Sequence, residues 1–282
     1  MTIRTIAVIG AGTMGRGIAQ VAAMTGVGVV LIDVDDATIR KALDALDGSL
    51  DRLVKRDKLT LPQKRTALGL IKGTAAYKEL TTADIVIEAA TENYDLKTKI
   101  LTQVDAMRRP DCVVASNTSS VSITKLASAL SRPDQFVGMH FFNPVPAMAL
   151  VEIVRGLQTS DATHDFVEAF AVQLGKSPIT VKSSPGFVVN RILLPMINEA
   201  FFVLAEGDAT ATEIDQGMKL GCNHPLGPLA LADLIGLDVL LSVMQIMHDE
   251  FGDSKYRPSP LLKELVAAGY LGRKCGRGIF RY

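Results

Sequence analysis

The chain has 282 residues and no formal net charge, because 30 Lys and Arg residues balance 30 Asp and Glu residues. A typical domain has about 100–200 residues, so this length predicts two domains. Hydrophobic residues make up 48% of the chain and charged residues 21%, which is usual for a globular protein and excludes a disordered one. The balanced charge argues against nucleic acid or an anionic membrane as a partner held by a long-range positive field.

The cysteines and the N-terminus bear on the compartment in which the protein works. The chain has three cysteines outside any C-x-x-C spacing, namely Cys112, Cys222 and Cys275. Their number and spacing disfavour a disulfide framework and a metal site, so we expect no metal and a reducing, cytoplasmic environment.

Arg16 and Gln20 interrupt the first apolar run before an export signal is complete. The most apolar stretch, residues 187–204, contains several polar side chains and predicts a buried helix, not a membrane span.

Short β-branched runs alternate with helical patterns from Ile3 to Gly186. Seven runs read as strands: IAVIG, VGVVLID, DIVIEAA, CVVAS, FVGMHFF, VEIV and PITVK. This alternation predicts an α/β Rossmann-type domain with a mostly parallel sheet. After the second run, residues 36–56 show helical spacing, and Thr60 with Pro62 is typical of the start of another helix. We therefore expect a helical insertion, close to an antiparallel helical pair.

The strand pattern stops after the sequence SSPG at residues 183–186. Beyond it, the spacing of apolar residues predicts only helices, over residues 187–206, 212–220, 228–251 and 260–268. Pro185 and Gly186 interrupt both periodicities. We place the domain boundary near Ser184, with the Rossmann-like domain over residues 1–184 and an all-α domain over residues 185–282.

The first predicted strand ends in a dinucleotide-binding fingerprint. Residues 10–15 read GAGTMG and open a predicted helix. Gly10 allows a tight turn, Gly12 lets backbone N–H groups approach a pyrophosphate, and Gly15 lets helix and strand pack closely. Thr13 and Met14 complete the predicted cofactor-binding turn. A plain strand-to-helix turn is the alternative, but it would leave the three glycines without a ligand to approach.

Asp33 closes the second predicted strand, about 20 residues after the fingerprint. Its carboxylate can accept hydrogen bonds from a ribose diol and would repel a 2′-phosphate, which favours NAD over NADP. Arg40 and Lys41 lie nearby in the sequence and leave the strictness of that choice open.

Six further motifs make the chain recognisable. They are IEAATEN (87–93), SNTSS (116–120), GMHFFNPVP (138–146), PGFVVNRI (185–192), NHPLGPLALADLIGLD (223–238) and LGRKCGRGIF (271–280). With VIGAGTMGRGIA at the N-terminus, they resemble the short-chain L-3-hydroxyacyl-CoA dehydrogenase family over the whole length. Within that family the resemblance is closest to the bacterial 3-hydroxybutyryl-CoA dehydrogenases.

The resemblance implies an NAD-dependent enzyme of fatty acid metabolism that interconverts 3-hydroxybutyryl-CoA and acetoacetyl-CoA. It also implies that the helical domain completes the acyl-CoA site and forms most of a homodimer interface. By motif, His140 would be the catalytic base and Glu152 its partner, with Ser119 and Asn190 positioning the substrate. Four residues would surround the nicotinamide and its ribose, namely Glu92, Lys97, Asn117 and Asn143.

Several of these residues also have a purely structural interpretation. An isolated histidine at the end of an apolar strand is usually a core residue, but the prolines that follow His140 predict a loop at a strand end, where such sheets bind ligands. We expect the other histidines to be structural, with His164 on a solvated helix. Ser119 or Ser120 could simply cap the helix that follows. Asn190 needs a hydrogen-bond partner, either in the protein or in the substrate.

A basic cluster, defined as Arg52, Lys55, Arg56 and Lys58, lies at the end of the first inserted helix. Such a cluster is usually a solvated helix face. It could also bind the phosphates of coenzyme A, with Lys55 as a substrate-binding residue.

Two other functions fit parts of this pattern. A dehydrogenase of a free hydroxy acid or sugar acid could use the same dyad and cofactor site, and a non-catalytic NAD-binding protein could keep the fold. The preferred acyl length depends on the shape of the pocket, which the sequence does not give.

Overall fold

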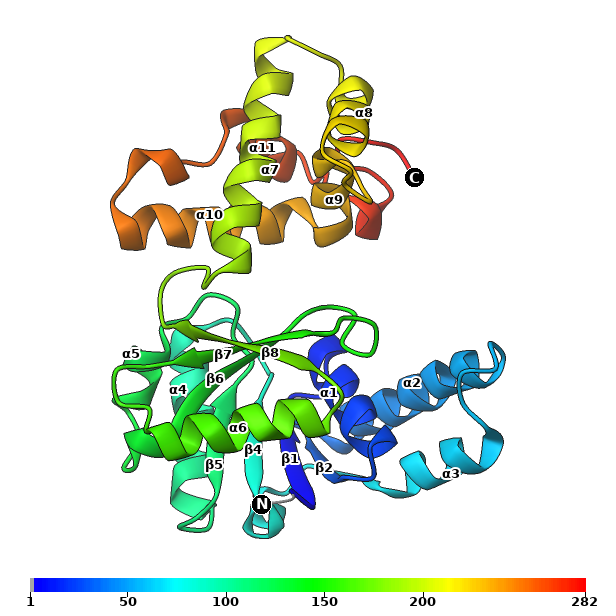
Figure 1. The fold of residues 1–282 in the computed structure, drawn as a ribbon, viewed down its shortest axis with the longest axis vertical. Coiled ribbons are helices and arrows are strands. Elements are labelled where there is room, and N and C mark those ends of the chain that lie inside the picture. The colour runs from blue at the N-terminus through cyan, green and yellow to red at the C-terminus, as the bar shows by residue number, and fades with distance from the viewer. Residues whose placement is uncertain (1–2) are drawn as a thin grey trace. The chain divides into compact units, whose positions relative to one another are not determined.

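The computed structural model describes residues 3–282 and divides into two compact units, one ending at Ser184 and the other beginning at Pro185. The first unit is built on an eight-stranded sheet with the order β3-β2-β1-β4-β5-β6-β7-β8 (Figure 1). Its strands are β1 (Thr5–Ile9), β2 (Gly28–Ile32), β3 (Ile71–Thr74), β4 (Ile85–Glu88), β5 (Val113–Ser116), β6 (Phe136–Phe141), β7 (Leu150–Arg155) and β8 (Ser177–Lys182).

Six of the seven strand pairs are parallel and one, β6 with β7, is antiparallel. The predicted mostly parallel sheet is confirmed, and all seven predicted strands are present. The sequence analysis missed β3, whose residues IKGT contain one large apolar side chain. A single apolar residue gives no strand period, so this edge strand leaves little trace in the sequence.

The central strands are buried on both faces, since every residue of β4 and β5 is buried. Alternate residues of β1, Ile6 and Val8, share a core with Ile18 of the first helix and Val167 of the sixth. The helices packed around the sheet are α1 (Thr13–Met24), α4 (Tyr94–Met107), α5 (Ile123–Ala127) and α6 (Asp161–Gln173), with short 3₁₀ turns η1 (Tyr77–Thr82) and η2 (Pro133–Gln135). This packing fixes the carboxyl ends of the central strands.

The predicted helical insertion consists of α2 (Asp36–Val54) and α3 (Leu61–Gly69), which project together to one side of the sheet in Figure 1. Thr60 caps α3 in a reciprocal capping box with Gln63. Lys64 of α3 lies 2.6 Å from Asp47 Oδ1 and 2.5 Å from Asp51 Oδ1 of α2. Its hydrogen bonds to Asp47 and Asp51 raise the pKa of Lys64, so these ion pairs join the two helices.

The second unit is helical, as predicted. Its elements are α7 (Val189–Glu206), α8 (Ala211–Gly221), α9 (Pro228–Ile235), α10 (Leu237–Phe251), η3 (Ser254–Tyr256), α11 (Pro260–Ala267) and η4 (Arg273–Cys275). Its own core includes Phe201 of α7, Leu229 of α9 and Met244 of α10. The first helix begins at Val189 rather than at residue 187, because Phe187 has a φ of +50°, which lies outside the right-handed helical region.

The single helix predicted over residues 228–251 was wrong. The chain forms two helices, α9 and α10, that meet at a bend of 97°. Gly236 stands between them with a φ of +104°, a conformation that glycine adopts without steric cost. Among the described residues no single helix has the length and apolar character of a membrane span, and only the bent pair of α9 and α10 meets that test jointly.

Candidate active site

The carboxyl ends of β1 and β4 form a topological switch point. β1 pairs with β2 on one side and with β4 on the other, so the connections that follow β1 and β4 diverge. Open α/β sheets bind their ligands in the crevice at such a point. Gly10 follows β1 with a φ of +98°, and a Cβ there would lie 2.6 Å from Ala90 Cα, just beyond β4. The two strand ends therefore approach this closely only with glycine at position 10.

The other two fingerprint glycines differ in what surrounds them. A Cβ on Gly15 would lie 1.7 Å from the carbonyl oxygen of Gly10, whereas a Cβ on Gly12 would have no atom within 4 Å. Gly12 is the N-cap of α1 and has no side chain to accept from the first N–H groups of the helix. These N–H groups and the helix dipole favour an anion. The open space at Gly12 and the uncapped helix start fit a pyrophosphate.

Asp33 follows β2 and holds the glycine turn in place. Its Oδ2 accepts a hydrogen bond from Ala11 N at 2.6 Å, and its Oδ1 accepts one from Val34 N at 2.7 Å. An ionised carboxylate can accept about four hydrogen bonds, so capacity remains for ribose hydroxyls. Tyr77 lies near this carboxylate: burial, and then the negative charges of Asp33 and Glu88, raise the pKa of Tyr77. The groups at the end of β2 thus fit a ribose diol.

A buried ion pair lies at the end of β4. Lys97 Nζ of α4 is 2.7 Å from Glu88 Oε2, and the two side chains are 1% and 0% exposed. Ser116 Oγ donates to the same Glu88 oxygen at 2.7 Å. Because a buried charge is costly unless it is paired and hydrogen-bonded, this arrangement accounts for both charges. The sequence analysis named Lys97 but missed Glu88, although an acidic residue ending the apolar run DIVIE was the available signal.

Glu92 accepts hydrogen bonds from the segment that follows β5. Its Oε1 accepts from Ser119 N at 2.7 Å and from Ser119 Oγ at 2.8 Å. Its Oε2 accepts from Thr118 Oγ1 at 2.6 Å and lies 3.9 Å from Lys97 Nζ. The structure therefore brings Ser119 together with two predicted site residues that lie more than 20 positions earlier in the sequence, Glu92 and Lys97.

The capping role considered for Ser119 and Ser120 was wrong. Ser122 is the N-cap of α5, and its Oγ accepts from Lys125 N at 3.2 Å. Ser119 lies three residues earlier and is engaged by Glu92 instead. Its hydroxyl still has lone pairs that can accept a hydrogen bond, which a substrate group could use.

The two predicted asparagines of the first unit lie on neighbouring segments. Asn117 is buried after β5, and its Oδ1 accepts from Phe141 N at 2.9 Å. This bond ties the end of β5 to the end of β6, one residue after His140. Asn143 is exposed in the loop of residues 142–149 that joins β6 to β7.

His140 and Glu152 form a buried pair across two strands. They are directly opposite each other in the antiparallel register of β6 and β7, where side chains on the same face come into contact. His140 Nδ1 lies 2.7 Å from Glu152 Oε2, with 7% and 0% of the two side chains exposed. The ring of Phe142 is 4.6 Å from the imidazole. His140 and Glu152, twelve positions apart in the sequence, are thus brought together as the predicted dyad.

This geometry assigns the protons of the imidazole. An ionised carboxylate only accepts hydrogen bonds, so Nδ1 carries the proton that it donates to Glu152. In neutral His140 the lone pair is then on Nε2, the atom able to accept a proton. A carboxylate in this position would stabilise an imidazolium, so the geometry is compatible with the predicted general base.

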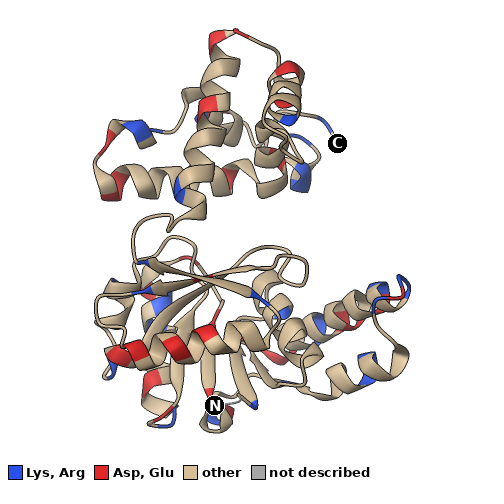
Figure 2. Ribbon diagram, in the orientation of Figure 1, with Lys and Arg blue, Asp and Glu red and all other residues tan. Residues whose placement is uncertain are grey.

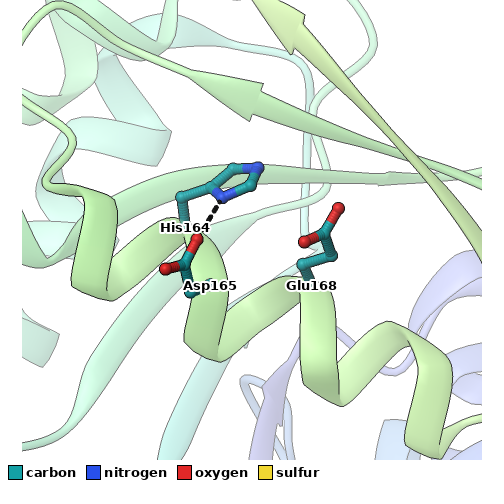
Figure 3. A group of neighbouring side chains, drawn as sticks. All are labelled: His164, Asp165 and Glu168. Carbon is teal, nitrogen blue, oxygen red and sulfur yellow. Dashed lines mark hydrogen bonds and ion pairs between the residues drawn. The ribbon is translucent and has the colours of Figure 1, made fainter.

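A second histidine, His164, lies on α6 (Figure 3). The sequence predicts a solvated helix here, but His164 itself is buried, with 9% of the residue exposed. Its Nδ1 is 2.9 Å from Asp165 Oδ1, and its Nε2 is 2.7 Å from Thr180 Oγ1 of β8. Glu168 stands one helical turn further on, and the three side chains could together approach a cation. Both ring nitrogens already have hydrogen-bond partners. His164 therefore connects α6 to β8, which is a structural role.

Asn190 belongs to the second unit, where it is half-buried in the first turn of α7. Its place in a mostly apolar helix agrees with the sequence pattern. Its contact with substrate stays a prediction.

Comparison with known proteins identifies the family. The model of the 3-hydroxyacyl-CoA dehydrogenase NAD-binding domain matches residues 5–184, and that of the C-terminal domain of the same family matches residues 186–282. The chain belongs to the 3-hydroxyacyl-CoA dehydrogenase family. Its cofactor is NAD, as the fingerprint and Asp33 predict, and the resemblance drawn from the motifs is confirmed.

Individual relatives cover almost the whole chain. A 3-hydroxybutyryl-CoA dehydrogenase from Bradyrhizobium diazoefficiens is 49% identical over 99% of this chain and 96% of its own. A probable 3-hydroxybutyryl-CoA dehydrogenase from Bacillus subtilis is 48% identical over 100% and 98% of the two chains. The crystal structure of (S)-3-hydroxybutyryl-CoA dehydrogenase PaaH1 from Ralstonia eutropha is 63% identical, with a TM-score of 0.97 over 100% of this chain and 99% of that one.

Proposed function

We propose that the protein transfers a hydride reversibly between NAD and C3 of a short-chain acyl-CoA, converting 3-hydroxybutyryl-CoA to acetoacetyl-CoA. The observation that carries this proposal is the buried pair of His140 and Glu152, with Nδ1 and Oε2 2.7 Å apart, in a chain whose relatives are named for this reaction.

The residues divide the work of the reaction between them. NAD, when bound, supplies the hydride acceptor. His140 Nε2 takes the proton of the 3-hydroxyl group, and Glu152 stabilises the resulting imidazolium. In the reverse direction the imidazolium returns the proton to the ketone. Ser119 and Asn190 orient the substrate in this proposal, while Glu92, Lys97, Asn117 and Asn143 shape the surroundings of the nicotinamide.

An assay of NADH consumption tests the activity. Purified protein should oxidise NADH in the presence of acetoacetyl-CoA and should react poorly with free acetoacetate or with NADPH. A preference for a free hydroxy or keto acid would contradict the proposal and favour the alternative substrate class. Kinetics over a series of longer 3-ketoacyl-CoA substrates would then set the acyl preference, because a methylene group in an apolar pocket contributes only about 1–3 kcal/mol.

The basic cluster is our candidate for the coenzyme A phosphates. All four side chains are exposed at the end of α2 and just beyond it, where Figure 2 shows basic residues close together. Lys64, by contrast, is already occupied by Asp47 and Asp51. Asp47 and Asp51 thus join the two inserted helices through Lys64, and the four residues of the basic cluster stay exposed to solvent.

Changing the four cluster residues together to Gln should raise KM for acetoacetyl-CoA roughly tenfold, since exposed ion pairs contribute about 0.2–1 kcal/mol each. KM for NADH should stay unchanged. A control with the same charge change would replace exposed lysines elsewhere, namely Lys78, Lys99, Lys182 and Lys219. Equal KM values for acetoacetyl-CoA in both variants would refute a role in binding coenzyme A, and the cluster would then be only a solvated helix face.

We also propose that the protein is a homodimer that uses its helical unit. This unit exposes large apolar side chains, among them Ile192 (68%), Leu220 (77%) and Leu234 (54%). Exposed apolar surface of this kind is typical of an interface, and two-fold dimers are the commonest oligomers. Sedimentation velocity should give twice the monomer mass, and a fully active monomer at assay concentration would refute the proposal.

A cytoplasmic location agrees with the state of the cysteines. Cys112, Cys222 and Cys275 are all free thiols, and burial raises the pKa of Cys112 to about 11, which keeps this thiol protonated and unreactive. Fractionation of producing cells tests this location, and recovery with an exported or membrane fraction would contradict it.

A further inference from the structure

Lys176 is a buried cation that none of the assigned roles uses. It lies between α6 and β8 and is 9% exposed. Its Nζ donates to the carbonyl oxygen of Val145 at 2.5 Å and to that of Met148 at 2.8 Å. Burial lowers the pKa of Lys176, as it does for any ammonium taken out of water. The partners of this ammonium are thus backbone carbonyls.

Both carbonyls belong to the loop of residues 142–149, which leaves β6 just after His140 and returns as β7 to Glu152. The same loop carries Asn143. Most of it is exposed, but Val145 is 2% exposed. The Val145 side chain packs against α1, since a Cβ on Gly17 would lie 2.7 Å from Val145 Cβ. The loop therefore touches the cofactor-binding helix about one turn from its start.

This loop needs an external donor. Pro144 and Pro146 have no backbone N–H, and the turn inside the loop uses the carbonyl of Pro144, which accepts from Ala147 N and Met148 N. The bond to the Val145 carbonyl is buried and that to the Met148 carbonyl is part-buried, and a buried carbonyl is costly without a partner. An ammonium has three donors, so one lysine can satisfy two carbonyls at once, and such charge-assisted bonds are stronger than neutral ones.

Lys176 is itself held rigidly. Its backbone N donates to the carbonyl of Ala171 at 2.9 Å, at the end of α6, and the next residue, Ser177, donates its N–H to Ala149 O at 2.8 Å. The side chain of Lys176 therefore extends from a backbone position just before β8 that these hydrogen bonds anchor. It fastens the middle of the loop, while Ser177 fastens the end.

We propose that Lys176 is a positioning residue for hydride transfer, because it fixes the loop that links the His140–Glu152 pair to the cofactor-binding helix α1. The inference rests on the proposed roles of His140 and Asn143. Hydride and proton transfer require the reacting groups to be held in register, and a misplacement of about 1 Å can lower the rate by roughly 10²-fold. A loosened loop would disturb the placement of Asn143 and of the end of β6.

Lys176→Met tests this, since it keeps the aliphatic length and removes the donors. With acetoacetyl-CoA and NADH, kcat per folded molecule should fall about tenfold or more, and KM for NADH should rise. The deuterium isotope effect on kcat, measured with NADH deuterated at the transferred position, should also increase, because hydride transfer becomes more rate-limiting. Lys182→Met removes an exposed lysine of β8 and should change none of these values.

A purely structural role predicts a different result. Lys176→Met would then lower the midpoint of thermal unfolding, but kcat per folded molecule and the isotope effect would equal those of the wild type, which would overturn the proposal. If the Met variant does not fold, Lys176→Gln, which keeps neutral donors, is measured by the same criteria. Failure of the proposed function itself would be distinct, because the wild type and Lys182→Met would both lack activity with acetoacetyl-CoA.

Discussion

Replacing His140 by Ala should lower kcat for acetoacetyl-CoA reduction by about 10²–10⁴-fold, the usual contribution of general acid–base catalysis. The variant lacks the group that gives the ketone its proton, while the turn at Gly10, Gly12 and Gly15 stays intact. NADH binding, followed by the change in its fluorescence, should therefore persist. Steady-state kinetics beside this titration would separate loss of chemistry from loss of cofactor.

Two further variants sharpen this result. Glu152→Gln keeps the size of the side chain but loses the charge that stabilises imidazolium, so kcat should also fall, by less than for His140→Ala. His164→Ala removes another buried imidazole of the same unit and should leave kcat per folded molecule unchanged. Near wild-type kcat in His140→Ala would refute the assignment and make Ser119 or a bound water the candidate proton carrier.

The chain's local patterns predict most of its fold. Runs such as DIVIEAA give a strand signal because the strand within them, here Ile85–Glu88, is buried on both faces of the sheet. The loss of that signal after residue 183 reflects the helical unit. The failures have local causes too. The edge strand β3 has one large apolar residue. Gly236 breaks a continuous helical pattern through a backbone angle that does not alter the spacing of apolar side chains.

The site was predictable only where its residues are close in sequence or matched a known motif. The glycine turn is contained in six residues, and its physical logic is local. The pairing of Lys97 with Glu88 depends on where α4 packs, and Lys176 reaches the carbonyls of a loop about 30 residues away. Sequence spacing does not show how α4 packs. It also does not show which carbonyls a lysine will meet, because backbone carbonyls exist at every position.

The second large effect is expected at the fingerprint glycines. Gly15→Ala should lower the stability of the fold, whereas Gly12→Ala should weaken NADH binding. At Gly15 the new methyl group would lie 1.7 Å from the Gly10 carbonyl oxygen, so the backbone must move. Overpacking of this kind costs about 1–3 kcal/mol or more, and the midpoint of thermal unfolding should fall even without cofactor. This loss is measured by calorimetry of the cofactor-free protein.

At Gly12 the methyl group would meet no atom within 4 Å, and the φ of −69° suits any residue. Gly12→Ala should therefore unfold at the wild-type temperature. Its methyl group would, however, occupy space that the pyrophosphate needs at the start of α1. KM for NADH should rise at least tenfold, equivalent to about 1.4 kcal/mol, with KM for acetoacetyl-CoA little changed. Gly69→Ala, also in open space but on the inserted arm, is the matched control. If Gly12→Ala bound NADH as tightly as the wild type, the pyrophosphate would have to lie away from the start of α1, and the cofactor would approach the switch point by another route.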